Sequence, residues 1–132
     1  MKKLLLAALF LSAPLAHADT KCSSAGADIM YIHQGYNKGM PPRDGDEIGR
    51  IQILLRGMLI SESIAYQNAE PKLGDYNPDF SEIKVLKEEN SGSGHVKDFS
   101  AKLTLTKREN AGPFDLPASY YMICQDVFFA IP

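Results

Sequence analysis

The sequence predicts a mainly β protein, either a small antiparallel β-sandwich or a curved sheet of five to six strands. Apolar and polar residues alternate strictly over residues 99–106, which is the pattern of a strand with one buried and one solvated face. Residues 119–132 are apolar on both alternating faces, which is typical of a strand inside a packed sheet. Glycine and proline separate the apolar segments at short intervals, as turns do between antiparallel strands.

Residues 1–18 have the three parts of a secretory signal peptide: two lysines, an apolar run over residues 4–11, and Ala-His-Ala as a small-x-small cleavage site. The apolar run is about half the roughly 20 residues that a membrane span needs. We therefore expect export across one membrane, to the bacterial periplasm. Residues 19–132 have the length of a single mature domain.

The mature chain is expected to be acidic. The full sequence has 14 basic and 16 acidic residues, and removal of the two signal-peptide lysines leaves 12 basic residues and a net charge of about −4. This balance argues against nucleic acid, whose recognition requires clustered lysine and arginine. It is compatible with a basic protein partner.

Cys22 and Cys124 are the two cysteines of the chain. In an oxidising compartment an even number of cysteines usually forms structural disulfides, and two cysteines allow one pairing. The bond would close a loop of about 100 residues, which in the chain-entropy model stabilises the fold by about 4 to 5 kcal/mol. A metal site that combines them with His33 and His95 is disfavoured, because the four lack a recognised ligand spacing. We expect no metal and no cofactor.

Residues 27–36 alternate on two faces and predict the first strand of the mature domain, after a Ser-Ser-Ala-Gly linker. Residues 37–49 contain two prolines and an Asp-Gly-Asp sequence and predict a long polar loop. Residues 68–78, with two prolines and a glycine, predict a second irregular stretch.

Residues 48–66 fit two structures. Helical spacing gathers most of their apolar side chains on one side, but it leaves three isoleucines on the polar side and Gly57 at the centre. Strand spacing fits comparably well and uses the isoleucines better. We favour two strands or one bulged strand. The alternative is an α+β fold in which this segment is a helix packed on the sheet.

Two more strands are predicted between Phe80 and Leu105. The segment between them, residues 88–95, is rich in glycine and serine and predicts a hairpin connection that lies outside the ladder. Residues 110–117 contain a glycine and two prolines and then turn the chain into the C-terminal strand.

No catalytic motif is present. A Ser/His/Asp hydrolase needs a serine on a strained turn, yet the sequence lacks Gly-x-Ser-x-Gly and the mature chain has two histidines. Nothing places two carboxylates on an apolar floor, as glycoside cleavage requires. Residues 44–47 resemble the start of a calcium loop, but Ile48 and Leu55 stand where later oxygen ligands belong. We therefore expect a binding protein, with a small envelope enzyme as a third hypothesis.

The hairpin tip is a candidate partner-binding finger. It consists of Ser91, Gly92, Ser93, Gly94 and His95. Glycines let the backbone approach a partner closely, and hydroxyl and imidazole groups can meet catalytic carboxylates in a concave active site. The plainer interpretation is a flexible hairpin end. A second candidate contact, suited to a basic rim, is the acidic group Asp44, Asp46 and Glu47.

Over about five residues this tip resembles a loop of the bacterial periplasmic lysozyme inhibitors. Those inhibitors are small exported β-proteins that plug the enzyme cleft with a loop carrying Ser-Gly and, a few residues on, a tyrosine. Here His95, Val96 and Lys97 follow instead of a tyrosine. The signal peptide, size, cysteine pair and acidity are also similar to exported immunity proteins that protect the periplasm from cell-wall-cutting effectors of type VI secretion. The resemblances imply an inhibitor of a muramidase-type enzyme, most simply an immunity protein against a secreted effector.

The alternative is a structural or assembly accessory protein of an envelope system such as a pilus or a secretion apparatus. The C-terminal strand, apolar on both faces, would then pair with the edge of a partner's sheet. The same apolar surface also predicts a homodimer, because a mature domain of this size cannot easily cover it.

Overall fold

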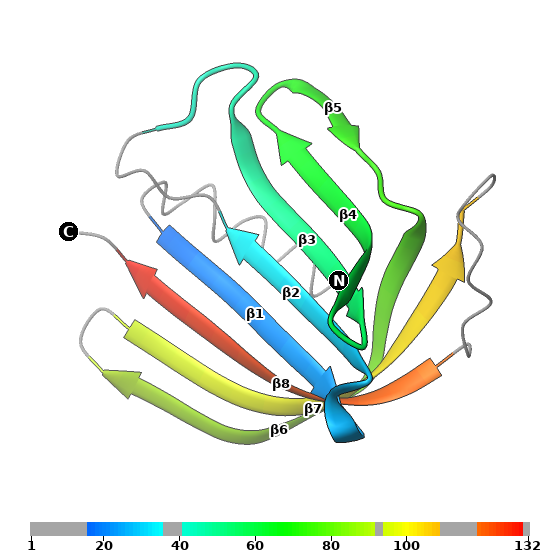
Figure 1. Ribbon diagram of the computed structural model, residues 1–132. Coiled ribbons are helices and arrows are strands. Elements are labelled where there is room, and N and C mark those ends of the chain that lie inside the picture. The colour runs from blue at the N-terminus through cyan, green and yellow to red at the C-terminus, as the bar shows by residue number, and fades with distance from the viewer. Residues whose placement is uncertain (1–15, 36–40, 92–93, 109–118, 131–132) are drawn as a thin grey trace.

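The computed structural model describes residues 16–35, 41–91, 94–108 and 119–130, which form one antiparallel sheet of eight strands (Figure 1). The strands are β1 (Ala16–Ser24), β2 (Ile29–Gly35), β3 (Glu47–Leu55), β4 (Met58–Tyr66), β5 (Ala69–Lys72), β6 (Tyr76–Ser91), β7 (Gly94–Lys107) and β8 (Ser119–Ala130). Their order in the sheet is β5-β4-β3-β2-β1-β8-β7-β6, and a short 3-10 turn, η1 (Ala25–Ala27), joins β1 to β2. The mainly β prediction is confirmed, as one curved sheet with more strands than the five to six predicted.

Residues 48–66, which fitted two structures, are the strands β3 and β4. The two strands meet at Arg56 and Gly57, whose φ angles are 49° and 81°. Positive φ at both central residues is what a two-residue type I′ hairpin turn requires, and its twist matches that of the flanking strands. The strand interpretation is confirmed for this segment and the helical alternative is wrong.

Three parts of the sheet differ from the prediction. β1 lies where the cleavage site and the linker were expected, β5 lies in the second irregular stretch, and β6 begins at Tyr76 instead of Phe80. From Asp19 to Ser24 the sequence of β1 shows no alternation of large apolar and polar residues, so no pattern marks it as a strand. The ladders to β2 and β8, on either side, hold it in place instead.

The β6–β7 hairpin also corrects a prediction. Residues 88–95 were expected outside the ladder, but Glu88 pairs with Lys97 and Asn90 pairs with His95. Polar residues are tolerated here because β6 is an edge strand, and all of residues 81–90 are exposed to solvent. Residues 92–93, at the centre of the predicted finger, lie outside the described residues.

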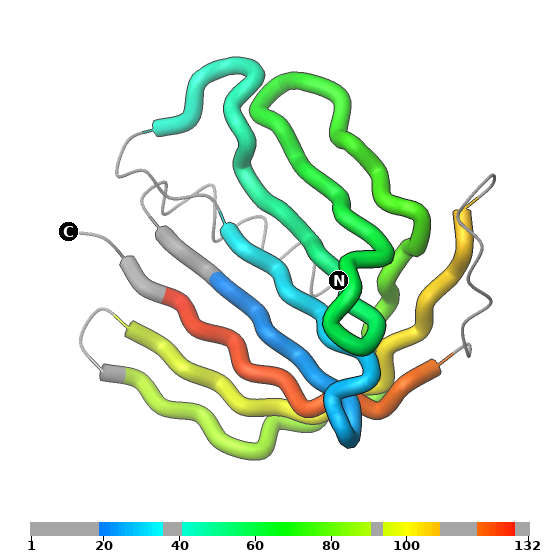
Figure 2. The backbone as a smooth tube through the Cα atoms, in the orientation of Figure 1, coloured from blue at the N-terminus to red at the C-terminus, as the bar shows by residue number. Residues whose placement is uncertain are grey.

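The sheet bends strongly around its own inner face (Figures 1 and 2). The pairing of β6 with β7 shifts between Ser81 and Lys84 and again after Val85, and Glu82 has a φ of 51°. Bulges of this kind bend a strand and increase its twist. The bend brings the start of β6 to β4, where the Ser61 hydroxyl accepts a hydrogen bond from the Tyr76 N–H at 3.2 Å.

The hydrophobic core lies on the inner face. Cys22 and Cys124 are directly opposite each other in β1 and β8 and form a disulfide, so the predicted bond is confirmed. The other buried residues of the core are Ile29, Tyr31, Ile53, Ile60, Tyr76, Phe99, Ala101, Leu103, Leu105 and Met122. The rings of Tyr31 and Phe80 meet edge to face, with centroids 4.8 Å apart. Every strand except β5 contributes to this core.

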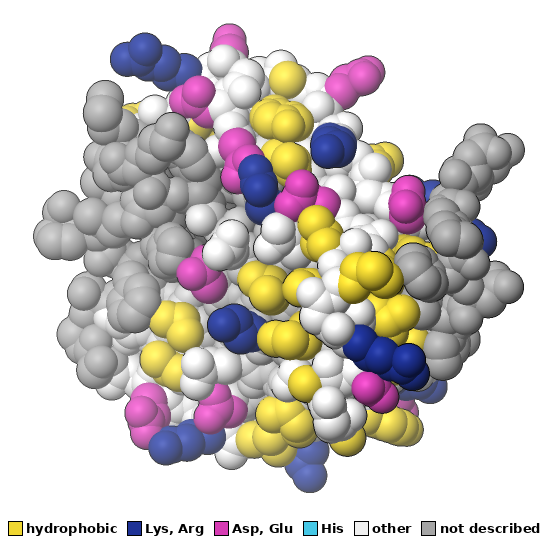
Figure 3. Space-filling view, in the orientation of Figure 1, with side chains coloured by type: hydrophobic (Ala, Val, Ile, Leu, Met, Phe, Trp, Pro, Cys, Tyr) yellow, Lys and Arg dark blue, Asp and Glu magenta, His cyan; other side chains and the backbone are white. Residues whose placement is uncertain are grey.

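β8 lies between β1 and β7, so its predicted central position is confirmed. Its two apolar faces were expected to be covered in a packed sheet, but one of them is not, because Met122 and Cys124 are buried while Tyr121 and Ile123 are 77% and 60% exposed. The described residues cover its inner face and leave the outer face open. Hydrophobic side chains also gather on the outer face of the sheet around the β3–β4 turn (Figure 3).

Candidate partner-binding site

A row of polar side chains crosses the inner face beside the core. Directly opposed residues of neighbouring strands share a face, so the row can be followed from β2 to β6. His33 lies opposite Thr20, Thr20 opposite Asp126, Asp126 opposite Lys97, and Lys97 opposite Glu88. In the neighbouring row the same strands carry Tyr31, Cys22, Cys124 and Phe99. The apolar core therefore ends at this line, which we call the polar row.

Asp126 is the centre of the polar row. The Thr20 hydroxyl donates a hydrogen bond of 2.5 Å to its Oδ1, and the Lys97 Nζ lies 3.7 Å from its Oδ2. The same ammonium lies 5.5 Å from the centre of the Phe99 ring, within the range of a cation–π contact. The centre of the row thus pairs the Asp126 carboxylate with the Lys97 ammonium, each about a third exposed, at the border of an apolar floor.

The polar row ends at His33 on β2, which is partly buried. Burial lowers the pKa of His33, although the carboxylates of Asp19 and Asp126 act in the opposite direction. Burial and the charge of Asp126 also raise the pKa of the neighbouring Tyr31 to about 12. At neutral pH this end of the row therefore offers a neutral imidazole and a neutral phenol.

His95 is the residue of the predicted finger whose side-chain contacts the structure describes. Its Nδ1 hydrogen-bonds to the Asn90 Oδ1, and its Nε2 lies 3.2 Å from a carboxylate oxygen of Glu88. Two neighbours on β6 thus fix the orientation of the ring, which shares the inner face with Lys97. His95 belongs to the base of the finger, where it continues the polar row.

The other finger residues are described only in part. Ser91 ends β6 and Gly94 begins β7, and these two residues pair with each other. The Ser91 side chain, Gly92 and Ser93 lie outside the described residues. Ser91 and Gly94 therefore lie at the end of the β6–β7 edge hairpin.

The acidic group forms contacts within the chain. The Asp46 carboxylate accepts a hydrogen bond of 2.9 Å from the Arg43 N–H, and the Asp44 carboxylate accepts one of 2.7 Å from the Asn68 side chain. Main-chain hydrogen bonds from Gly45 and to Asp46 also join this turn to the β4–β5 turn. The two aspartates therefore lie on an anchored turn, where Asp44 remains exposed.

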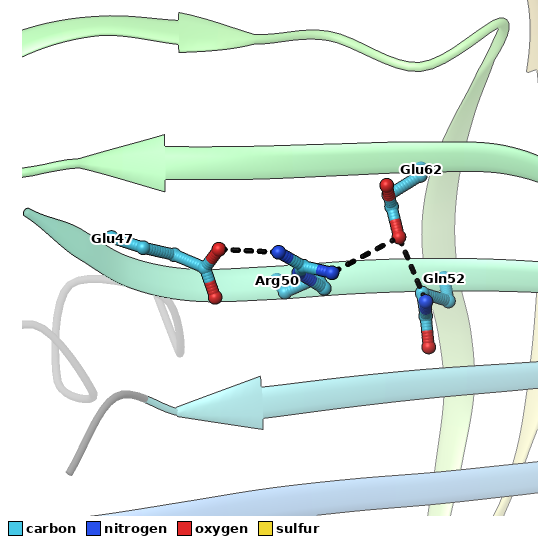
Figure 4. Close-up of polar contacts among 4 residues, drawn as sticks. All are labelled: Glu47, Arg50, Gln52 and Glu62. Carbon is cyan, nitrogen blue, oxygen red and sulfur yellow. Dashed lines mark hydrogen bonds and ion pairs between the residues drawn. The ribbon is translucent and has the colours of Figure 1, made fainter.

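Glu47 lies in β3, not in the loop where it was expected, and belongs to a network on the outer face (Figure 4). The Arg50 guanidinium lies 2.5 Å from a Glu47 oxygen and 3.5 Å from a Glu62 oxygen. Gln52 donates a hydrogen bond of 2.8 Å to the same Glu62 oxygen. The bond with Glu47 raises the pKa of Arg50. Because Arg50 compensates the charge of Glu47, the two aspartates are the stronger candidates for a partner contact.

The structure places the described finger residues Ser91, Gly94 and His95 and the acidic group at the same end of the sheet (Figure 1). β7 begins there, β8 and β2 end there, and Glu47 at the start of β3 lies beside the end of β2. In the order of strands, β2, β1 and β8 lie between the two contacts. The polar row crosses these three strands close to that end.

Thr20, Asp126 and Lys97 were not predicted as site residues. The only sequence signal for them was that Gln125 and Asp126 interrupt an otherwise apolar strand.

Comparison of the chain with protein-family models, with curated proteins and with solved structures finds no match. In the part of the chain that the structure describes, no three His, Cys, Asp or Glu side chains are grouped so that they could hold a metal ion. The same residues contain no helix that is long and apolar enough to span a membrane.

Proposed function

We propose that this protein is an exported inhibitor of a cell-wall-degrading, muramidase-type enzyme, and that it acts as an immunity protein against a secreted effector. One observation carries the proposal. The base of the finger and the turn that holds Asp44 and Asp46, which we call the acidic turn, lie at one end of the sheet, with the polar row between them. A hairpin end can enter a concave cleft while the acidic turn meets a basic rim of that cleft.

The chemistry of this end suits such a target. Muramidases cleave glycosidic bonds, and most enzymes that do so present a pair of carboxyl groups in the cleft. The Lys97 ammonium is about a third exposed and can donate a hydrogen bond to such a carboxylate in addition to its contact with Asp126. The His95 imidazole can do so by exchanging its contact with Glu88 for one with the target. Hydrogen bonds to charged acceptors are the stronger kind. The glycines of the finger allow its backbone to approach the floor of a narrow cleft.

The disulfide supports export, because such bonds persist in oxidising compartments such as the periplasm.

The alternative, an accessory protein whose C-terminal strand pairs with the edge of a partner's sheet, has less support. β8 is paired on both sides and has no free edge to offer to another sheet. Of the edge strands, β5 is four residues long and contains Pro71, and β6 is bulged and charged. Both edges therefore oppose strand addition.

The first experiment measures inhibition directly. The purified mature protein is added to muramidases, including any that it captures from the producing bacterium, and hydrolysis of peptidoglycan is followed by turbidity. Inhibition with a stoichiometric end point is expected for at least one enzyme. Failure to inhibit any muramidase, together with capture of a different class of protein, would refute the proposed function.

The second experiment tests the finger. Replacing Ser93 and His95 together by alanine removes a hydroxyl and an imidazole that would be desolvated in the cleft. We expect affinity for the inhibited enzyme to fall about thirtyfold or more, as for other central contacts of an interface. A matched control replaces Ser81 and Lys84 by alanine, which are exposed on β6 away from the finger. Unchanged affinity in the finger variant would move the contact to the acidic turn or to the face of the sheet.

A further inference from the structure

The outer face of the sheet carries a strip of apolar side chains that the proposed function does not use. Leu59, Leu54, Met30, Ser23 and Ile123 form one row across β4, β3, β2, β1 and β8. Tyr121 lies two residues before Ile123 and therefore faces the same side. We call Leu59, Leu54, Met30, Ile123 and Tyr121 the outer strip. Leu59, Tyr121 and Ile123 are exposed, while Leu54 and Met30 are partly buried between them. Exposed apolar side chains that gather on one face of a sheet mark an interaction surface.

Beside Tyr121 the surface is hollowed. The hollow has a volume of about 450 Å³, and its lining includes Ser23, Ser100, Glu82 and Ile123 as well as Tyr121 itself. A ring that is 77% exposed thus stands at the margin of a space large enough to receive another aromatic side chain. This pairing of a projection with an adjacent hollow is self-complementary: a two-fold axis can place the Tyr121 ring of each copy in the hollow of the other.

The charges around the hollow also fit a second copy of this chain. Lys102 lies 3.9 Å from Glu82, which lines the hollow. Lys84 pairs across the ladder with Ser100, and Asp98 lies two residues before Ser100 on the same face. The rim therefore carries charges of both signs. A second copy can set cation against anion across a two-fold axis, whereas a strongly acidic or strongly basic partner would meet like charges on part of this rim.

From these observations we infer that the outer strip is the interface of a homodimer. Two copies that cover the outer strip together with the rim of the hollow would bury on the order of 1,000 Å² in total. This area is near the lower limit for a specific interface, so the dimer is expected to dissociate on dilution. The outer strip lies on the opposite face from the polar row, so the dimer leaves the proposed inhibitory end free.

Sedimentation velocity of the mature protein, from about 1 to 100 µM, tests the inference. The parent protein should approach the dimer mass as its concentration rises. Tyr121→Lys should raise the dimer dissociation constant at least tenfold, because it removes the aromatic ring that would fill the hollow of the other copy. Ile123→Lys serves as an independent second variant in case the first one folds poorly. Circular dichroism of each variant should match the parent, since both side chains are largely exposed.

The matched control is Leu73→Lys, at a leucine that is 59% exposed but lies between β5 and β6, outside the outer strip. This variant should dimerise as the parent does. A parent protein that stays monomeric at the highest concentration overturns the inference. So does a dimer that Tyr121→Lys and Ile123→Lys leave intact, or one that Leu73→Lys weakens equally.

Discussion

Cys22 and Cys124 stand directly opposite each other in the adjacent strands β1 and β8, with their Cα atoms 4.0 Å apart, although 102 positions separate them in the chain. Their disulfide lies in the row of the inner face that also contains Tyr31 and Phe99, immediately beside the polar row. It therefore ties both strands that carry Thr20 and Asp126 into the core.

We expect removal of the disulfide to lower the stability of the fold. Replacing both cysteines by alanine should lower the free energy of unfolding by about 2 to 5 kcal/mol, measured by urea denaturation. Denatured but unreduced parent protein should contain no thiol that reacts with a maleimide. Cys22→Ala alone is the control, because it must release one reactive thiol at Cys124. Two reactive thiols in the exported parent protein would contradict the bond.

Gly74, between β5 and β6, and Gly49, in β3, provide a matched pair of substitutions. A Cβ atom at Gly74 would lie 2.9 Å from the Glu62 nitrogen and closer still to the Ser61 hydroxyl, whereas at Gly49 the nearest atom, on His33, is 3.7 Å away. We expect Gly74→Ala to destabilise the fold by about 1 to 3 kcal/mol, because the approach of β6 to β4 is already close-packed.

Gly49→Ala should change the stability by about 0.5 kcal/mol or less, since its Cβ makes ordinary contacts. Both free energies come from the same denaturation experiment. Equal losses in the two variants would show that the close approach at Gly74 does not determine the cost.

Much of the sheet could be predicted because local patterns specify it. Strict alternation marks β7, and the isoleucines of residues 48–66 favour strands over a helix. The two cysteines allow one pairing, so the contact between β1 and β8 could be predicted even though β1 itself could not. The sequence of β1 has no apolar alternation that would mark it as a strand. The strand forms nevertheless, because the ladders to β2 and β8 and the disulfide hold it. The bulge at Glu82 is set by the tertiary bend, which has no local signature.

The candidate site, too, could be predicted from the sequence only in part. His95 was predicted from a short motif, but its partners Asn90 and Glu88 become neighbours only through the antiparallel pairing of β6 with β7. The contact of Thr20 with Asp126 joins residues 106 positions apart. Such a contact depends on the order of the strands, which pattern analysis does not supply. The sequence therefore indicated the end of the hairpin but not the polar row behind it.

His33 makes the stability of the fold depend on pH. Burial lowers its folded-state pKa below the usual value of about 6.5, so between these two values the unfolded chain binds more protons than the folded protein. The contribution of His33 is therefore complete above about pH 6.5 and is lost as the pH falls toward the folded-state value. Asp19 and Asp126 raise the pKa and limit the effect.

The measurement is the free energy of unfolding of the parent and of His33→Gln between about pH 5 and pH 8. The difference between the two proteins should be constant above about pH 6.5 and should shift in favour of the variant at lower pH, because glutamine does not titrate. Curves that stay parallel over the whole range would show that His33 is not desolvated in the folded protein.

The acidic turn yields a prediction about the rate of binding. Charge reversal at Asp44 or Asp46 would also break their hydrogen bonds to Asn68 and Arg43, so a neutral isostere is the cleaner change. Asp44→Asn keeps a side-chain oxygen that can accept from Asn68 and removes only the charge. If the turn meets a basic rim on the inhibited enzyme, this variant should associate several-fold more slowly at low salt, with little change in the dissociation rate.

The salt dependence separates this steering effect from a loss of structure. Exposed charges are largely screened within about 4 Å at 500 mM salt but act over more than 20 Å at 20 mM, so the two association rates should converge at high salt. Asp79→Asn is the control, because Asp79 is an exposed aspartate near the start of β6, far along the strand from the finger. It should bind at the parent rate in both buffers. If Asp44→Asn slows association by the same factor at both salt concentrations, the charge of Asp44 does not guide the partner, and the finger with the polar row must form the contact without it.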